Sequence, residues 1–395
     1  MKRGISLIIY AAQLSLCTVG WPGSLPLARA QTNWPQLGFD NTHSGWNRSE
    51  TLLSPANVAG LQPLWTFPTQ GTFSSPAVVD GVLYVGSGDG HVYAVSASTG
   101  APVWKTLLAG GGTSSSPAVV GGTVFIGTGV DTGFFYALNA SNGKAIWRFR
   151  PKSGVASSPA VANGIVYFGS NDKRVYALNA STGAVVWSTR TNATVFSSPA
   201  VDNGMVFVAT EAGTTLGLNA ATGTVVWAVT SLDNTIFSSP AVANGIVYIG
   251  ITNGFVVALQ AATGTPVWRK LVVPPGSFGG ILGSPSVASG VVYIGTDLGT
   301  FWALDAATGG GLWQAKFPGE TFVSSPAVAN GVVYAAGETA NLHVMDASTG
   351  QTLNTLTTGG PLYYSSPVVV DGMVYAGSFD KQMHAWSLPG GALLK

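Results

Sequence analysis

A short motif, Ser-Ser-Pro or a one-residue variant of it, recurs eight times along this chain at nearly constant spacing. Successive prolines are 40 to 45 residues apart and lie at Pro76, Pro117, Pro159, Pro199, Pro240, Pro285, Pro326 and Pro367. A fixed period in this range is typical of a repeat architecture, in which each small unit buries its hydrophobic surface only against its neighbours. The period therefore constrains the fold more strongly than any single residue does.

Each repeat contains four short apolar runs separated by glycine-containing turns, as in residues 74–108. Short runs rich in Val, Tyr, Ala and Leu predict consecutive antiparallel strands, which we call A to D. The A–B turn is Asn-Gly or Asp-Gly in most repeats, for example Asp80-Gly81 and Asn163-Gly164. These pairs accept the positive φ of a two-residue type I′ hairpin. The pattern therefore predicts eight four-stranded antiparallel sheets.

A tryptophan follows the C–D turn glycine by four residues in most repeats, and Asn354 takes its place in the seventh. A large ring at one position of every repeat predicts packing between neighbouring sheets, because the indole contributes a large apolar area to such a contact. We therefore assign a structural role, the docking of one sheet on the next, to Trp65, Trp104, Trp147, Trp187, Trp227, Trp268 and Trp313.

The two ends of the repeat region complement each other. The eighth repeat supplies strands A to C without a strand D, whereas residues 63–67 read as a strand D with no A to C before it. We expect the N-terminal strand to complete the last sheet and close a ring, which removes an open edge. An open solenoid would need polar caps at both ends, and neither end looks like one. The sequence thus predicts an all-β, eight-bladed β-propeller of four-stranded antiparallel blades over residues 63–391, after a non-repeat segment at 31–62.

Residues 1–30 have the pattern of a cleaved secretory signal. Lys2 and Arg3 precede the apolar run Ile5–Leu16, and the small-residue pattern Ala-Arg-Ala stands at 28–30. We expect cleavage after Ala30 and a periplasmic or extracellular protein. The single cysteine, Cys17, lies in the removed segment; lipid attachment there is the alternative, although the preceding leucine fits a lipobox poorly.

The composition of the mature chain excludes some classes of partner. Without Lys2, Arg3 and Arg29 it has 14 basic and 16 acidic residues, a net charge of −2, so nothing draws nucleic acid to it electrostatically. No apolar run of 18 residues follows residue 30, so we expect no membrane span. Without cysteine it forms no disulfide and no thiolate metal site. We expect a monomer.

The residue before each Ser-Ser-Pro is expected to face the mouth of the channel, on the face that carries the D–A and B–C loops. We call this the top face. Several of these residues are aromatic, whereas the opposite face consists almost entirely of Gly, Asn, Thr and Ser turns. We predict a ligand-binding funnel there, formed by Phe73, Phe196, Phe237, Leu282, Phe322, Tyr363 and Tyr364. The alternative is that these side chains fill the channel as ordinary core.

Other polar residues give no catalytic constellation, and catalytic residues stay unassigned. Seven B–C loops carry an acidic residue: Asp89, Asp131, Asp172, Glu211, Asp297, Glu338 and Asp380. Calcium needs six or more oxygens at one point, and separate blades hold these carboxylates apart, so we interpret them as turn residues and predict no metal site. The four histidines lack metal-ligand spacing. The longest D–A loop, residues 271–283, is the most irregular and the best candidate for a functional loop.

The repeat SSPAVVDGVLYVGSGDGHVYAVSASTGAPVW, residues 74–104, closely resembles the pyrroloquinoline quinone (PQQ) repeat. That family includes PQQ-dependent dehydrogenases and the propeller lipoprotein of the bacterial outer-membrane assembly machine. The match covers residues 63–390. The segments at 34–42 and 53–61 also look like the start of quinoprotein alcohol and polyvinyl-alcohol dehydrogenases.

The resemblance implies PQQ with calcium as a cofactor, but the chain departs from the family at the active site. Many of those enzymes place PQQ over adjacent cysteines, and the mature chain has none. It has no C-x-x-C-H haem attachment, and the family's calcium-binding Glu, Asn and Asp have no assignable counterpart. We therefore favour a non-catalytic module that binds a protein or polymer at the top-face funnel. A PQQ-dependent oxidoreductase is the alternative, since fold does not decide function.

Overall fold

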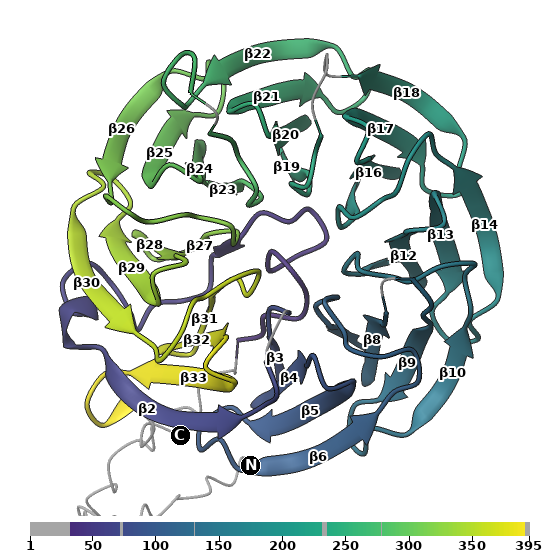
Figure 1. Ribbon diagram of the computed structural model, residues 1–395, viewed down its shortest axis with the longest axis horizontal. Helices are drawn as coiled ribbons and strands as arrows, with labels where there is room; N and C mark the ends of the chain where they lie inside the picture. Colours follow the sequence, from purple (N-terminus) through teal and green to yellow (C-terminus); the bar gives the residue numbers. More distant parts are fainter. Residues whose placement is uncertain (1–31, 72–73, 130, 231–234, 278, 392–395) are drawn as a thin grey trace, which may run out of the picture. The chain divides into compact units, whose positions relative to one another are not determined.

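The strands of the protein form eight sheets arranged in a ring around a central channel (Figure 1). The computed structural model describes residues 32–71, 74–129, 131–230, 235–277 and 279–391. Within these residues, seven sheets have four strands and one has a fifth, short strand, β1 (Trp46–Asn47). The predicted all-β, eight-bladed propeller is confirmed. The predicted signal segment and its cleavage site lie outside the described residues.

Each of the first four blades is built from consecutive strands in the order A to D, from the channel outwards. Blade 1 consists of β3 (Ala77–Val79), β4 (Val82–Gly86), β5 (His91–Ser96) and β6 (Pro102–Leu107). Blade 2 consists of β7 (Ala118–Val120), β8 (Thr123–Gly127), β9 (Phe135–Asn139) and β10 (Ala145–Phe149). Blade 3 consists of β11 (Ala160–Ala162), β12 (Ile165–Ser170), β13 (Arg174–Asn179) and β14 (Val185–Arg190). Blade 4 consists of β15 (Ala200–Asp202), β16 (Met205–Ala209), β17 (Thr214–Asn219) and β18 (Val225–Thr230).

The remaining blades repeat this order; in blade 7 the short β1 pairs with β27, and blade 8 takes its strand D from the N-terminal part of the chain. Blade 5 consists of β19 (Ala241–Ala243), β20 (Ile246–Gly250), β21 (Phe255–Gln260) and β22 (Pro266–Leu271). Blade 6 consists of β23 (Ser286–Ala288), β24 (Val291–Gly295), β25 (Thr300–Asp305) and β26 (Gly311–Lys316). Blade 7 consists of β27 (Ala327–Ala329), β28 (Val332–Ala336), β29 (Asn341–Asp346) and β30 (Thr352–Thr357). Blade 8 consists of β31 (Val368–Val370), β32 (Met373–Ser378), β33 (Gln382–Ser387) and β2 (Gln62–Pro68).

The A–B hairpins have the geometry that their sequence predicts. In blade 1, Val79 pairs with Val82, so Asp80 and Gly81 form a two-residue loop. Their φ angles are 50° and 75°, the left-handed values that a type I′ turn requires. Because the turn fixes the register, every residue of strand B is assigned to one face of its blade.

The N-terminal strand closes the ring. β2 pairs antiparallel with β33, and Trp65 lies opposite Ala385 in the register. In Figure 1, β2 lies on the outer side of β33, so residues far apart in sequence share one sheet. The predicted pairing of residues 63–67 with the last strand C is confirmed.

Tryptophan side chains on strand D join neighbouring blades near the outer rim. The Nε1–H of Trp187 donates to the Ala220 carbonyl of the next blade at 2.8 Å. A Cβ on Gly223 would lie 2.6 Å from the same indole, so this turn position requires glycine for space as well as for its φ of 73°. The same indole-to-carbonyl bond joins Trp65 to Ala97, Trp104 to Ala140, Trp147 to Ala180, Trp227 to Ala261, Trp268 to Ala306, and Trp313 to Ala347. We call these contacts the tryptophan girdle.

The girdle is interrupted between blades 7 and 8. There Asn354 occupies the tryptophan position, and its Nδ2 donates to the Val58 carbonyl at 2.9 Å. Val58 begins the 3-10 helix η1 (Val58–Gly60), which precedes β2. Blade 8 has no continuous C–D turn, because its strands C and D come from opposite ends of the repeat region. Blade 8 therefore has no turn glycine against which an indole could pack, and the shorter Asn354 side chain, bonded to η1, occupies the tryptophan position.

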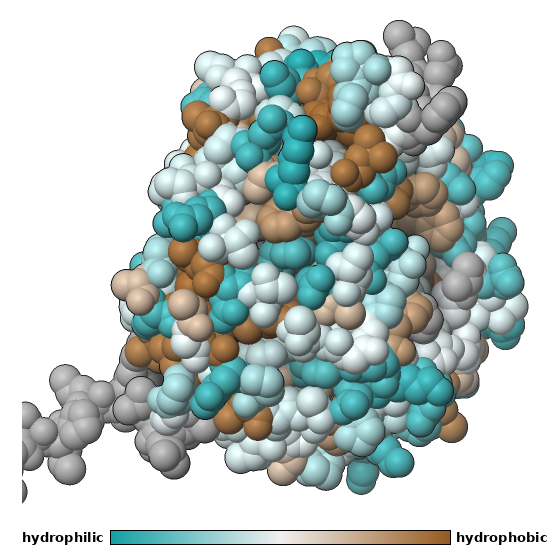
Figure 2. Space-filling view, turned by 60° about the vertical axis from the view of Figure 1, so that its left-hand side comes forward, coloured by the Kyte–Doolittle hydropathy of each residue, from teal (hydrophilic) through white to brown (hydrophobic). Residues whose placement is uncertain are grey.

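The outer rim exposes alternate residues of strand D. Leu312 of β26 and Val226 of β18 are exposed, whereas Trp227 on the same strand as Val226 is buried. Figure 2 shows part of the outer surface, where hydrophobic residues lie in small patches among hydrophilic ones. No helix within the described residues is long and apolar enough to cross a membrane.

Residues 34–47 cross the central channel and bond to every blade in turn (Figure 1). We call them the channel segment. Trp34 pairs with Val78 of blade 1, and Asn47 Nδ2 donates to the Val369 carbonyl of blade 8. In between, six residues of the channel segment each accept one hydrogen bond from a strand A amide of blades 2 to 7. The pairs, in order, are Pro35 with Val119, Gln36 with Val161, Asn41 with Val201, Thr42 with Val242, Ser44 with Val287, and Gly45 with Val328.

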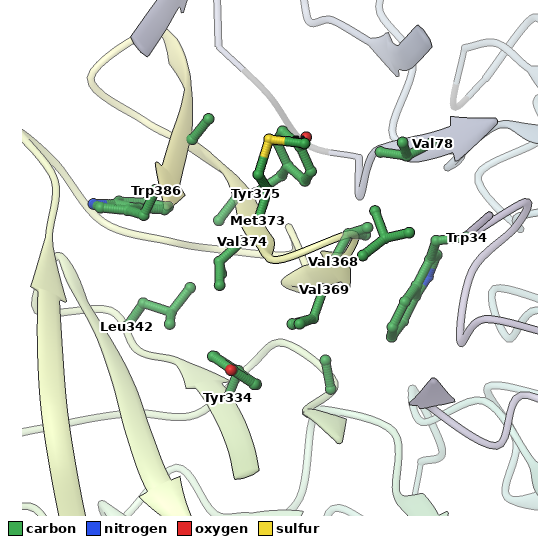
Figure 3. Packing of buried hydrophobic residues seen from close by; sticks show 14 of the residues in the cluster. Trp34, Val78, Tyr334, Leu342, Val368, Val369, Met373, Val374, Tyr375 and Trp386 are labelled. Atoms are coloured by element: carbon green, nitrogen blue, oxygen red, sulfur yellow. Dashed lines mark hydrogen bonds between the residues drawn. The ribbon is translucent and has the colours of Figure 1, made fainter. Parts of the chain in front are cut away.

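The channel segment also joins the hydrophobic core. Trp34 is buried and belongs to the same hydrophobic cluster as Val78 of blade 1 and Val368 of blade 8 (Figure 3). The sequence predicted residues 31–62 only as a non-repeat segment. Its course through the channel depends on contacts with all eight blades, which no local pattern specifies.

Candidate functional site: the top-face funnel

The second serine of the motif forms a closed ring around the channel. The backbone N–H of Ser116 donates to Ser158 Oγ at 2.8 Å, and this bond recurs from each blade to the next. It also joins blade 8 to blade 1, where the Ser366 N–H donates to Ser75 Oγ at 2.8 Å. The eight members of this serine ring are Ser75, Ser116, Ser158, Ser198, Ser239, Ser284, Ser325 and Ser366.

The first serine of the motif has a different role. Ser197 Oγ donates to the Ala209 carbonyl and accepts from the Ala209 N–H, both at 2.8 Å. Ser74 makes the same pair of bonds to Gly86 of its own blade. One serine therefore holds strand B, and the next links two blades. These two structural roles, one within a blade and one between blades, explain why both serines recur in the repeat.

A cavity of about 560 Å³ lies at the channel mouth, beside the serine ring. Four residues of the predicted funnel line it: Phe196, Phe237, Leu282 and Tyr364. Seven ring serines, all but Ser75, line it as well, together with Ser114, Ala156, Gly283, Val323, Ser324 and, from the channel segment, Leu37. The channel segment bonds to strand A beyond the motif, towards the A–B turns, and borders the cavity through Leu37. Phe73 lies outside the described residues.

Two residues predicted for the funnel lie elsewhere. Phe322 is 1% exposed and packs in the core between blades 6 and 7, with its ring 5.4 Å from Phe301. Tyr363 does not line the cavity, and its ring packs 4.9 Å from Phe379. Both stand one position before a funnel residue. Their neighbours Val323 and Tyr364 line the cavity instead.

The aromatic rim of the funnel is open. Phe237 is 44% exposed and Tyr364 is 57% exposed, so these rings border the cavity and do not fill the channel as core. The rings of Phe196 and Phe237 lie 6.2 Å apart and come from neighbouring blades. Tyr364 has a φ of 50°, a value that bulky residues rarely adopt. Strain of this kind is found where the surrounding structure holds a side chain in place, often at a binding site.

Among the described residues, the cavity lining is uncharged: it includes no Lys, Arg, His, Asp or Glu. The acidic residues of the B–C loops accept hydrogen bonds from their own loop and, as at Asp380 from the Gly359 N–H at 2.9 Å, from the neighbouring D–A loop. Asp89 accepts from the His91 N–H at 3.0 Å and the Tyr93 hydroxyl at 2.7 Å. Burial, with the Asp89 carboxylate, raises the pKa of Tyr93 to about 12. Asp380 bonds to His384 Nε2 at 2.8 Å.

The sequence analysis did not predict a buried acid–base pair that Glu320 and His343 form in blade 7. Glu320 is buried, and its carboxylate contacts His343 Nε2 at 2.9 Å and the Thr339 hydroxyl. Burial raises the pKa of Glu320, but hydrogen bonds from His343 and Thr339 outweigh it and leave the pKa below its usual value. The pair does not line the cavity. Across the described part of the chain, no three His, Cys, Asp or Glu side chains converge as metal ligands would.

Comparison with known proteins agrees with this architecture. Residues 120–388 match the family model of the β-propeller of the beta-alanine-activating enzyme, and residues 54–148 match that of the outer membrane protein assembly factor BamB. The chain belongs to the family of PQQ-repeat β-propellers. The resemblance inferred from the Ser-Ser-Pro repeat is thereby confirmed.

Curated relatives match part of this PQQ-repeat propeller. Tetrathionate hydrolase of Acidithiobacillus ferrooxidans is 28% identical over 135 residues, which are 33% of this chain and 27% of the relative. Quinohemoprotein alcohol dehydrogenase of Comamonas testosteroni is 27% identical over 154 residues, 35% of this chain and 22% of the enzyme. The matches thus span about a quarter of the length of these relatives.

Solved structures extend the likeness to most of the chain. BamB from Moraxella catarrhalis has a TM-score of 0.68 at 20% identity and covers 83% of this chain and 97% of its own. A europium-containing methanol dehydrogenase has a TM-score of 0.78 at 15% identity and covers 90% of this chain and 98% of its own. At these identities the likeness shows the fold alone. It connects the propeller equally to BamB-like and to quinoprotein-dehydrogenase-like proteins.

The residues of the funnel do not fit PQQ with calcium. PQQ carries three carboxylates, and burying a carboxylate without a cationic partner is strongly unfavourable. Within the described part of the chain, the cavity supplies serine hydroxyls, apolar side chains and Tyr364 as lining groups. Calcium requires several converging carboxylate or carbonyl oxygens, and the described lining residues include no carboxylate.

Proposed function

We propose that this propeller is an exported binding or scaffold module that captures a protein or polymer at the top-face funnel without catalysis. The observation that carries the proposal is the open, uncharged cavity at the channel mouth, rimmed by exposed Phe237 and Tyr364. A concave apolar pocket with a few convergent polar groups is the usual form of a binding site. Exposed aromatic rings anchor ligands at low entropic cost.

The non-catalytic assignment follows from the lining. General acid–base or nucleophilic catalysis needs a titratable or activated group within hydrogen-bond reach of the substrate. The described side chains around the cavity are serines, aliphatic groups and aromatic rings, with no titratable group apart from Tyr364. The PQQ-dependent oxidoreductase, suggested by the quinoprotein relatives, is the competing function, and the experiment below separates the two.

The test uses the purified chain from Gln31 and three probes: maltohexaose, an uncharged hexapeptide of Ala and Thr with blocked ends, and PQQ with CaCl₂. Calorimetry measures binding, and dye reduction with ethanol measures dehydrogenase activity. We expect at least one of the first two probes to bind, and to bind at least tenfold more weakly to the Phe237→Ala/Tyr364→Ala variant. Leu107→Ala, which removes an exposed apolar side chain from the outer rim, is the matched control and should bind normally. Dye reduction dependent on PQQ, or failure of both probes to bind at the funnel, contradicts the proposal.

Export is tested separately by mass spectrometry of the protein recovered from the periplasm or medium of an expressing bacterium. We expect an N-terminus at Gln31, because the small residues at 28–30 suit signal cleavage. A diacylated Cys17 at the N-terminus would instead place the propeller on a membrane surface.

A further inference from the structure

We infer that the funnel binds an uncharged saccharide chain, with the serine ring recognising its hydroxyl groups and the aromatic rim packing on its carbon–hydrogen faces. The inference rests on the proposed function, because it concerns the same cavity. Three observations carry it: the unused hydrogen-bonding capacity of the ring, the absence of charge in the lining, and the occupied amides of the inner strands.

Each ring serine retains a hydrogen-bond donor and an acceptor. A serine hydroxyl has one proton to donate and two lone pairs to accept. Ser198 Oγ accepts one bond, from the Ser158 N–H at 2.9 Å, and Ser239 Oγ accepts one from the Ser198 N–H at 2.9 Å. Among the described residues, the ring serines accept these bonds, and none of them donates its hydroxyl proton to another protein group. Saccharide hydroxyls also donate and accept at one oxygen, so they match this pattern.

The uncharged lining selects against anions and cations. A uronic acid, a phosphorylated sugar or PQQ would bring carboxylates or phosphates into a cavity whose described lining residues include no Lys, Arg or His to pair with them. The lost hydration would be only partly replaced by serine hydroxyls. A neutral chain loses much less on entering the cavity. Charge is therefore the property by which the site discriminates most strongly.

The inner strands of blades 1 to 7 have their channel-facing amides already bonded to the channel segment. Extended peptides are often recognised by adding a strand to a free sheet edge. The innermost strands of this propeller are the A strands, and the amides of Val201, Val242 and Val287 already donate to the channel segment. A peptide in the funnel would leave its own backbone groups without sheet partners. This favours the saccharide over the peptide.

The rim supplies the apolar half of the site. Phe196 and Phe237 lie 6.2 Å apart on neighbouring blades, and Tyr364 stands exposed among the other lining residues. Aromatic faces pack on apolar carbon–hydrogen surface, which a sugar ring presents on its faces while its hydroxyls point outwards. The arrangement of hydroxyls beside aromatic rings thus matches the two kinds of surface on one sugar.

The experiment measures affinity by calorimetry for maltohexaose and cellohexaose, for the acidic hexagalacturonate, and for the blocked Ala/Thr hexapeptide. We expect a neutral hexasaccharide to bind at least tenfold more tightly than hexagalacturonate and the peptide. Ser198→Ala and Ser239→Ala should each weaken that binding about 2- to 10-fold, the net value of one hydrogen bond. Ser75→Ala is the matched control, because Ser75 makes the same ring bonds but does not line the cavity.

The outcomes separate this inference from the proposed function. Equal or tighter binding of hexagalacturonate overturns the inference, as does an equal loss of affinity in Ser75→Ala and Ser198→Ala. Peptide binding that is lost in Phe237→Ala, with no binding of either neutral saccharide, overturns the inference and leaves the proposed function standing. If no probe responds to Phe237→Ala, both fail. Thermal unfolding of each variant, followed by circular dichroism, confirms that the folded protein is being compared.

Discussion

Neighbouring blades are joined by two kinds of contact, the tryptophan girdle near the rim and the serine ring at the channel, and the two behave differently between blades 7 and 8. The girdle is broken between blades 7 and 8, where Asn354 bonds to η1. The serine ring continues at that junction, where the Ser325 N–H donates to Ser366 Oγ at 3.1 Å. The girdle needs a glycine turn on the next blade to receive its indole, and blade 8 has no continuous C–D turn. The ring needs only the start of strand A, which every repeat supplies.

The two contacts also differ in how much they stabilise the ring. A buried indole contributes a large apolar area, and truncating it removes that area and leaves a cavity. A ring serine contributes one hydrogen bond, with a net value of about 1 kcal/mol. The outer contact should therefore carry most of the interblade stability, and the inner contact should align the blades and present hydroxyls to the funnel. Four predictions test this comparison.

Removing the N-terminal part of the chain should have the largest effect. Deleting residues 31–68 removes the channel segment, which bonds to all eight blades, and β2, which completes blade 8. We expect loss of the closed ring and aggregation through the exposed edge of β33. Size-exclusion chromatography and circular dichroism, with the chain from Gln31 as control, provide the measurement. A monomeric, folded deletion variant would show that the girdle and serine ring hold the ring without closure.

Truncating one tryptophan of the girdle should destabilise the protein strongly. Trp187 is buried and donates to Ala220, so Trp187→Ala should lower the free energy of unfolding by about 3–5 kcal/mol. Asn354→Ala at the corresponding position of blade 7 should cost only about 1 kcal/mol, because it removes an amide hydrogen bond and little apolar area. Urea unfolding followed by tryptophan fluorescence and circular dichroism compares them. Equal losses in the two variants would refute the assigned role of the girdle.

Acid should weaken the channel segment. Burial lowers the pKa of His43 from 6.5 to about 4, so between these values the unfolded chain binds more protons than the folded protein. The contribution of His43 is fully present above pH 6.5 and is lost as the pH falls towards 4, at up to about 1.4 kcal/mol per pH unit. Thermal unfolding from pH 7 to pH 4 measures the slope. In His43→Asn, which suits the positive φ at this position, the slope should be shallower, and an unchanged slope would exclude His43 as its source.

Removing single ring serines should have the smallest effect on stability. Ser75→Ala and Ser198→Ala should each lower the free energy of unfolding by about 0.5–1.5 kcal/mol, since each loses one acceptor for a neighbouring amide. The two values should agree although only Ser198 lines the cavity. A loss above about 3 kcal/mol in either variant, measured by urea unfolding, would show that the inner ring stabilises the protein as strongly as the girdle.

Much of the fold could be predicted because its signals are local and repeated. Asp80-Gly81 specifies a hairpin whatever surrounds it, and a strand D without its own repeat, at residues 63–67, predicted the closure that β2 makes. The funnel was harder to predict residue by residue. Phe196 and Tyr364 line the cavity as expected, but Phe322 and Tyr363 point elsewhere. Which of two neighbouring side chains faces the cavity depends on the local backbone conformation, and aromatic character alone does not reveal that.

The sequence by itself determined the number of blades, the strand order within each blade, the hairpin turns and the closing strand, because each depends on turn chemistry or on a count of repeats. Only the tertiary structure decided the course of the channel segment and the joining of eight serines into one ring beside an uncharged cavity. Those features arise when residues 40 or more positions apart meet around one axis. The second serine of each motif is only part of the repeat pattern in the sequence, but in the folded ring it is one of eight hydroxyl groups arranged around the channel.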